Sequence, residues 1–401
     1  MTDVRFSAED WARIRRDWSA WWDGQIDRPM IIIRRMDPAR AKRLPQAPGF
    51  VPQLPLEEMT DEQVVDRYQA QIEATDFYGD AWPKWWINFG PGALAAWLGA
   101  RTHVDANTVW FEPPDTAEST GGTVAAATET PMLRAGETPA IHTGGTPVLP
   151  GSPIERLELP YRDDRPWWRR VRGLTATAVR RWGDSINVSY TDIGGNADVL
   201  ASFLTTQALL TALCDAPEHV DRLARQVTAA WLRYYDELGR IILPAGAGTT
   251  PWAPIWSPRR CYMLQSDFCY MISPAMFERF VLPDLEACCA GMEHGFYHLD
   301  GKGQLVHLDM LLSIRRLRGV QWIPGAGQPQ AEQWPDVLAR IRRAGKLCQV
   351  YTDAPGAMRI VRELGGAGFA IEVGGLSEPR QIREFLADIQ RESRRRTKPE
   401  W

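Results

Sequence analysis

Strand-like and helix-like segments alternate along this chain from residue 81 onward, and this alternation constrains the fold more than any other feature. Short runs rich in β-branched and aromatic residues predict strands at 85–89, 186–190, 250–256, 294–299, 319–323, 346–351 and 368–373. Amphipathic segments predict helices at 93–98, 197–212, 217–239, 274–291, 304–315, 331–344, 355–364 and 378–392. Strands separated by helices run parallel, so we expect an α/β protein. The number of units favours a closed (β/α)8 TIM-type barrel over an open doubly wound sheet.

The first 80 residues precede this alternation and are predicted to form an N-terminal helical extension that packs on the barrel. Residues 7–23 and 60–79 begin with capping residues and predict helices, while residues 30–34 (MIIIR) predict a strand between them. The barrel is then expected to span residues 81–401. Residues 115–153, which are rich in Thr, Gly and Pro, are predicted to interrupt it as a long surface insertion.

Charge and cysteine content exclude several classes of protein. The formal net charge of −4 gives no basis for binding nucleic acid or an anionic membrane. No apolar run approaches the roughly 20 residues that cross a bilayer, and charged sequence after Met1 predicts that no signal peptide is present. Six cysteines without a Cys-x-x-Cys pair indicate free thiols in a reducing cytoplasm.

Eighteen tryptophans can fill a core or line a pocket for a flat or apolar ligand.

A histidine and an aspartate follow one predicted strand into a glycine-rich loop. Residues 297–303 read YHLDGKG, so His298 and Asp300 lie two positions apart and point to the same side of the strand. Such a pair can bind a divalent metal, or the carboxylate can fix the tautomer of a histidine acid or base. The structural alternative is a pair that only braces the loop.

Several segments carry the features of a known enzyme superfamily. They are residues 190–198 (YTDIGGNAD), 215–220 (DAPEHV), 267–274 (DFCYMISP), 277–283 (FERFVLP) and 297–303. Together they resemble the uroporphyrinogen decarboxylase superfamily, which includes cobamide-dependent methyltransferases that pass methyl groups between corrinoids and thiols. The resemblance covers about residues 60–390. It implies a TIM-type barrel with its active site at the C-terminal ends of the strands.

The resemblance to the methyltransferases implies a metal site with altered ligands. Those enzymes hold zinc with a His-x-Cys pair and a later Cys, and His298 matches their histidine. Asp300 stands where the first Cys would be, and no Cys follows the predicted strand 368–373. The expected cofactor is therefore zinc or another divalent metal at a harder, oxygen-rich site. Such a site would use His298 and Asp300 with Asp267 or Glu372.

The resemblance to the decarboxylases is weaker. Those enzymes need no metal and receive the carboxylates of a tetrapyrrole with an arginine-rich loop. Arg34 and Arg35 are a reduced version of that loop. Asn88 stands near the position of the family's key Asp, and Tyr190 corresponds to its Tyr. These departures argue against a porphyrinogen substrate.

The other candidate residues lie at or near predicted strand ends. Asp192 and Asp267 are each either a pocket carboxylate or a helix N-cap. Glu372 lies inside an apolar strand, where a carboxylate is a brace or a functional group. The predicted substrate-binding residues are Trp86, Asn88, Trp252, Trp256, Asp267, Trp322, Gln328, Tyr351, Arg34 and Arg35.

We expect a methyl (one-carbon) transferase of a small-molecule substrate. The catalytic residues predicted for it are His298, Asp300, Tyr190 and Asp192, with an aromatic wall for a flat or apolar donor such as a corrinoid or a corrinoid protein. Two alternatives stay open. The first is decarboxylation of a smaller carboxylated substrate through Arg34, Arg35 and Tyr190. The second is a non-catalytic barrel that binds a corrinoid or another small molecule. A homodimer is the expectation that the superfamily resemblance implies.

Overall fold

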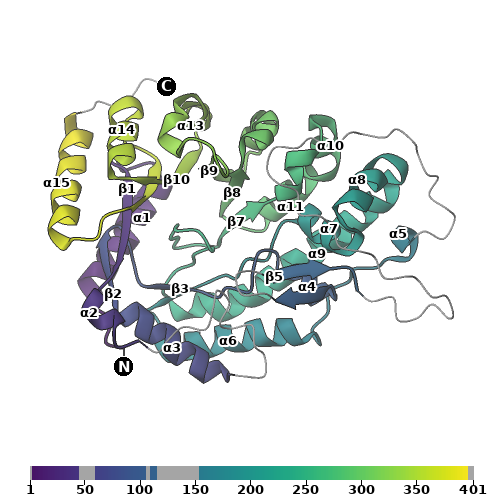
Figure 1. Cartoon of the computed structure of the whole chain (residues 1–401), viewed down its shortest axis with the longest axis horizontal. Coiled ribbons are helices and arrows are strands. Elements are labelled where there is room, and N and C mark those ends of the chain that lie inside the picture. Colours follow the sequence, from purple (N-terminus) through teal and green to yellow (C-terminus); the bar gives the residue numbers. More distant parts are fainter. Residues whose placement is uncertain (1, 45–58, 105–108, 115–152, 396–401) are drawn as a thin grey trace.

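Seven strands form one sheet in the computed structural model, which describes residues 2–44, 59–104, 109–114 and 153–395 (Figure 1). Their order is β2–β1–β11–β10–β9–β8–β7. The bounds are β1 (Met30–Met36), β2 (Thr75–Gly79), β7 (Cys261–Gln265), β8 (His294–Asp300), β9 (Leu317–Ile323), β10 (Leu347–Asp353) and β11 (Phe369–Gly374). All neighbours are parallel except β2, which is antiparallel to β1. The region predicted as an extension thus supplies two strands of the sheet itself.

A second parallel ladder joins β3 (Lys84–Trp86) to β6 (Asn187–Ser189). Directly after β6, the N–H of Tyr190 donates to the carbonyl of Thr250 at 3.0 Å, so the chain around residue 250 lies beside this ladder. The parallel ladders confirm the α/β class and are compatible with a TIM barrel. Strand pairing within the described part of the chain does not join them into a closed barrel. A separate antiparallel hairpin consists of β4 (Arg101–Val104) and β5 (Val109–Glu112).

The predicted strand 250–256 is wrong. Pro251 and Pro254 carry no backbone N–H, and an isolated bridge between Thr249 and Ser257 takes the place of a ladder. The strand of the central sheet in this part of the chain is β7, which the sequence analysis did not predict.

The described part of the chain contains fifteen α-helices. They are α1 (Ala8–Trp22), α2 (Pro38–Ala41), α3 (Asp61–Glu73), α4 (Leu94–Leu98), α5 (Pro153–Arg156), α6 (Pro166–Trp182), α7 (Asn196–Leu204), α8 (Thr206–Asp215), α9 (Pro217–Ile242), α10 (Pro274–Phe280), α11 (Leu282–Ala290), α12 (Leu308–Ser313), α13 (Pro335–Arg343), α14 (Ala354–Leu364) and α15 (Pro379–Arg395). The predicted insertion 115–153 lies outside the described residues, apart from Pro153 in α5. None of the described helices has by itself the length and apolar character to cross a membrane. Only α7 and α8 taken together, bent by 104°, meet that criterion.

Helix α1 closes the N-terminal ends of the strands with tryptophan. Its buried indoles are Trp11, Trp18, Trp21 and Trp22. They pack in one cluster with side chains from the starts of the strands, namely Met30, Ile32, Met263, Phe296, Leu347 and Ala370. Three of the indole N–H groups donate to backbone carbonyls at 2.9 to 3.2 Å, so burial leaves these polar groups satisfied. Because the inner face is filled at this end, any opening of that face lies at the C-terminal ends of the strands.

The two faces of the strands differ in polarity. One face packs on helices in the larger hydrophobic core, to which Tyr190 and Tyr297 contribute. On the other face, the apolar layer over α1 gives way to polar side chains two residues later along each strand. The steps from apolar to polar are Ile32 to Arg34, Met263 to Gln265, Phe296 to His298 and Ala370 to Glu372. A polar layer therefore occupies the C-terminal half of this face.

The contribution of α1 can be measured by truncating one indole. Trp18 is fully buried, whereas Trp110 in β5 is 59% exposed and serves as a matched control. We expect Trp18→Ala to lower the free energy of unfolding by about 3–5 kcal/mol, because it leaves a large cavity. Trp110→Ala should change it by less than about 1 kcal/mol. Urea denaturation followed by circular dichroism measures both free energies. Equal effects of the two substitutions would show that the buried indole of Trp18 does not contribute specifically to stability.

Candidate active site

Four polar side chains lie in register across β7, β8, β9 and β10. Gln265 is paired with His298, His298 with Gln321, and Gln321 with Gln349. Gln321 and Gln349 are fully buried, and Gln265 is 7% exposed. Polar residues at this depth in parallel strands need partners. His298, Gln321 and Gln349 are hydrogen-bonded in series, whereas Gln265 is hydrogen-bonded to Asp192. The row places His298 near its middle.

Three possible metal ligands meet at one end of this row. Asp267 opens the 3-10 turn η2 (Asp267–Met271) that follows β7, while His298 and Asp300 are alternate residues of β8. Their ligand atoms all lie within 4.8 Å of one another. The Nε2 of His298 is 3.8 Å from a carboxylate oxygen of Asp300. His298 and Asp300 thus lie on the same face of β8, and Asp267 lies beside them.

The ring of His298 is held from two sides. Its Nδ1 is hydrogen-bonded to the amide oxygen of Gln321. Its edge meets the indole of Trp252, with ring centroids 5.0 Å apart and nearly perpendicular planes. Trp86 extends this aromatic wall, 6.5 Å from Trp252. The imidazole therefore presents Nε2 to the carboxylates, as a metal ligand or a proton acceptor requires.

Two further carboxyl groups, those of Asp192 and Asp198, interact with Asp267. Burial, together with the negative charge of Asp267, raises the pKa of Asp192 to about 7. The pKa of Asp198 is raised to about 8, again by burial and then by Asp267. Its carboxylate accepts the backbone N–H groups of Asp267 (3.1 Å) and Phe268 (2.7 Å), which fixes the start of η2. Loss of surrounding water also raises the pKa of Asp267, with His298 opposing and Asp300 adding to the effect.

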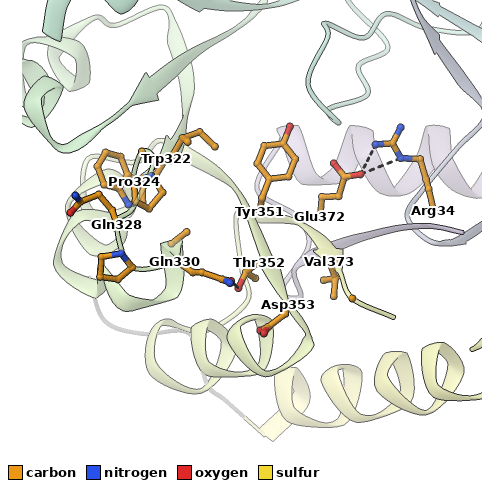
Figure 2. Close-up of a pocket in the computed structure, with 16 residues that line it drawn as sticks. Arg34, Trp322, Pro324, Gln328, Gln330, Tyr351, Thr352, Asp353, Glu372 and Val373 are labelled. Carbon is orange, nitrogen blue, oxygen red and sulfur yellow. Dashed lines mark hydrogen bonds and ion pairs between the residues drawn. The ribbon is translucent and has the colours of Figure 1, made fainter. Parts of the chain in front are cut away.

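A cavity of about 670 Å³ opens beside this group, at the ends of β9, β10, β11 and β1 (Figure 2). Trp322, Pro324 and Gln328 lie on one side of it, Tyr351 is central, and Arg34 with Glu372 lie on the other side. The three candidate ligands do not line it, but its lining residue Ile323 is the strand partner of Asp300, so the cavity lies next to the end of β8. The volume suits a small-molecule ligand.

An ion pair separates this cavity from a second one. Arg34 binds a carboxylate oxygen of Glu372 at 2.5 Å, and both residues line both cavities. The second cavity measures about 420 Å³ and includes Lys84 and Trp86. The ammonium of Lys84 donates to the carbonyls of Trp252 and Ala253, both at 3.0 Å, and so fixes the segment that carries the indole over His298.

Several predicted site residues have other surroundings. Tyr190 points to the opposite face and packs on Tyr235, 4.7 Å away, because alternation turns it toward α9. Trp256 belongs to the cluster under α1, where its indole donates to the carbonyl of Ala247 at 2.8 Å. Neither lies in the predicted pocket.

Arg34 and Arg35 point to opposite faces of β1, because side chains alternate along a strand. Glu372 lies with Arg34 and not with the candidate metal ligands. Arg35 binds Asp76 at 3.0 Å on the side away from Arg34. Glu372 pairs with Arg34 and is not among the group of Asp267, His298 and Asp300. The side chain of Asn88 accepts the N–H of Gly90 at 2.9 Å and braces a turn.

The sequence analysis missed Gln265, Gln321, Gln349, Lys84 and Asp198. A usable signal was present for the glutamines. Each is a single uncharged polar residue in an otherwise apolar strand (CYMLQ, VQWI and LCQV), where burial favours a residue with a partner. Lys84 and Asp198 gave no such signal, because their partners come from loops far along the chain.

Comparison with known proteins gives a likeness of fold. No protein-family model and no curated protein sequence matches this chain. Among solved structures that match is a methyltransferase from Methanosarcina mazei, with a TM-score of 0.55 and 10% sequence identity. The match covers 94% of this chain and 98% of that one, so the two proteins share a fold along nearly their whole lengths. A fold shared at this identity leaves the reaction to be argued from the site.

The buried carboxylates predict how stability depends on pH. Asp192 holds its proton in the folded state up to about pH 7, whereas an unfolded Asp releases it near pH 4. The folded protein then binds more protons between these values, so its free energy of unfolding should fall as the pH rises from 4 to 8. The raised pKa of Asp192 sets an upper bound of about 4 kcal/mol on its share.

Urea denaturation at pH 5, 6, 7 and 8 tests this dependence. Asp192→Asn should flatten the decline, because the substituted amide does not ionise. Asp184→Asn, at a side chain that is 71% exposed, is the control and should follow the wild type. A decline of the same slope in both variants would contradict the assignment to Asp192.

Proposed function

We propose that this protein transfers a methyl group to a small acceptor that is activated at Asp267, His298 and Asp300. The observation that carries the proposal is the meeting of these three donors beside an open cavity of small-molecule size. The fold likeness to a methyltransferase supports the choice of reaction class. In this proposal the acceptor binds at the three donors and the methyl donor occupies the neighbouring cavity of about 670 Å³.

The donor set fits a divalent metal ion. One imidazole nitrogen and two carboxylates within 4.8 Å of one another match the ligands of zinc, manganese or iron sites that lack thiolate. Loss of surrounding water raises the pKa of Asp267, and the negative charge of Asp300 adds to this effect, whereas a bound cation would oppose both. When bound, such a cation would act as a Lewis acid and lower the pKa of the acceptor that it coordinates.

The residues of the chain have separate roles in this proposal. His298 offers the lone pair of Nε2, as a ligand when the cation is bound and as a proton acceptor in its absence. Trp252 and Trp86 keep water from the side of the imidazole. Trp322 and Tyr351 give the neighbouring cavity flat apolar surfaces, and Gln328 adds a hydrogen-bonding edge for the donor. A corrinoid, free or carried by a protein, is the donor that this wall and the open mouth would suit.

Metal titration of the purified full-length protein tests the ligand set. After treatment with a chelator, we expect the wild type to bind about one equivalent of Zn²⁺ or Mn²⁺ in isothermal titration calorimetry. His298→Ala and Asp300→Asn should weaken binding at least about 10–100-fold. His103→Ala is the control, since His103 is an exposed residue of β4. Binding that is absent in the wild type, or equal in all variants, would remove the metal-assisted form of the proposal.

Turnover tests the reaction itself. With methylcobalamin as donor and a panel of thiols and amines as acceptors, we expect loss of the cobalt-bound methyl group and appearance of methylated product. His298→Ala should slow this about 10²–10⁴-fold, as loss of a ligand or a proton acceptor does. Binding of methylcobalamin without turnover would indicate a non-catalytic binding protein. Release of carbon dioxide from carboxylated ligands, abolished in Arg34→Ala, would indicate a decarboxylase.

A further inference from the structure

We infer that Gln321 and Gln349 are positioning residues that hold neutral His298 as the tautomer protonated on Nδ1. This leaves the lone pair of Nε2 directed at Asp267 and Asp300. The meaning of the tautomer for catalysis rests on the proposed function. The tautomer itself follows from hydrogen bonds of the described residues and can be measured without a metal or a substrate.

The three side chains form a continuous chain of hydrogen bonds across β8, β9 and β10. The imidazole Nδ1 of His298 is bonded to the Oε1 of Gln321. The amide nitrogen of Gln321 donates to the Oε1 of Gln349. The amide nitrogen of Gln349 donates to the backbone carbonyl of Val350 at 3.0 Å. Strand register makes this chain, because each side chain is paired with the next one across the ladder.

The backbone carbonyl sets the direction of the whole chain. A carbonyl oxygen only accepts, so the group of Gln349 that faces Val350 has to be its NH₂. The Oε1 of Gln349 then faces Gln321 and requires an N–H from it. That orientation turns the Oε1 of Gln321 toward His298, and this oxygen requires an N–H on Nδ1. A neutral imidazole carries one N–H, so Nε2 is left with its lone pair.

Burial prevents the chain from reversing. Gln321 and Gln349 are both 0% exposed, so water cannot replace a lost partner. Turning both amides over would set the Oε1 of Gln349 against the carbonyl of Val350, two acceptors without a proton between them. Two such facing acceptors cost about 1–3 kcal/mol, and the inferred tautomer requires that this cost exceed the attraction of the Asp300 carboxylate, 3.8 Å from Nε2, for a proton on Nε2. Metal-ligating histidines are commonly fixed through their second nitrogen by such a partner.

Imidazole nitrogen NMR of the full-length, ¹⁵N-labelled protein measures the tautomer. The signal of His298 is identified by its loss in His298→Ala, and spectra are recorded without metal at a pH where the ring is neutral. We expect Nδ1 to be the protonated nitrogen in the wild type. A wild type protonated on Nε2, or an equal mixture of the two, would overturn the inference without any substitution of Gln321 or Gln349.

Variants test the chain link by link. Gln321→Glu keeps an acceptor for the Nδ1 proton and should retain the tautomer, whereas Gln321→Leu removes it and should give a mixture. Gln349→Leu frees the amide of Gln321 to turn and should also shift the population toward Nε2. The matched control is Gln304→Leu, because Gln304 is 1% exposed but is bonded to the hydroxyl of Tyr297. An unchanged spectrum in both Gln321→Leu and Gln349→Leu would contradict the inference.

Zn²⁺ titration of the same samples separates this inference from the proposed function. We expect Gln321→Leu to weaken binding about 10–100-fold and Gln321→Glu to retain it. A wild type with the Nδ1 proton but no affinity for Zn²⁺ would support the positioning role and contradict the metal site. The opposite result, tight Zn²⁺ binding with the proton on Nε2 in the free protein, would contradict the positioning role alone.

Discussion

Packing of the α1 tryptophans against the starts of the strands is the interaction on which the rest of the structure depends. A curved parallel sheet has an inner face that must be filled by side chains or by a ligand. Here indoles from outside the sheet fill the N-terminal half of that face, together with side chains such as Phe296 and Met263. The C-terminal half of the inner face can then carry polar residues. The buried apolar surface that stabilises the fold lies in the tryptophan cluster at the N-terminal half and in the larger core between strands and helices.

The polar half is stable because its members have partners. Arg34 is neutralised by Glu372, and Lys84 is surrounded by backbone carbonyls. The glutamines Gln321 and Gln349 are hydrogen-bonded along their row. The carboxylates near Asp267 differ, because burial and mutual repulsion raise their pKa values. Carboxyl groups whose pKa values are raised in this way change their protonation near neutral pH, so a proton or a cation can change the charge of the site.

Sequence reasoning predicted the fold class and the proximity of His298 and Asp300 for different reasons. The alternation of strands and helices depends on local periodicity, which a single sequence displays, so the parallel α/β class was confirmed. His298 and Asp300 were found because two chemically distinctive residues stand two apart at a strand end. Tyr190 was placed wrongly because nothing local tells which face of a short buried strand carries the site. Trp256 was misplaced since a tryptophan near a strand end fits a pocket wall and a core equally well.

The site is divided between two parts of the sheet, and this division bears on the chemistry. Strands β7 and β8 bring Asp267, His298 and Asp300 together, while β9, β10 and β11 line the larger cavity. The glutamines link the two parts. Gln321 and Gln349 belong to β9 and β10, which line the cavity, and their chain of hydrogen bonds reaches the imidazole of His298. In the proposed transfer between two bound molecules, the division would keep the acceptor's activating groups at a fixed position while a differently shaped donor occupied the space beside them.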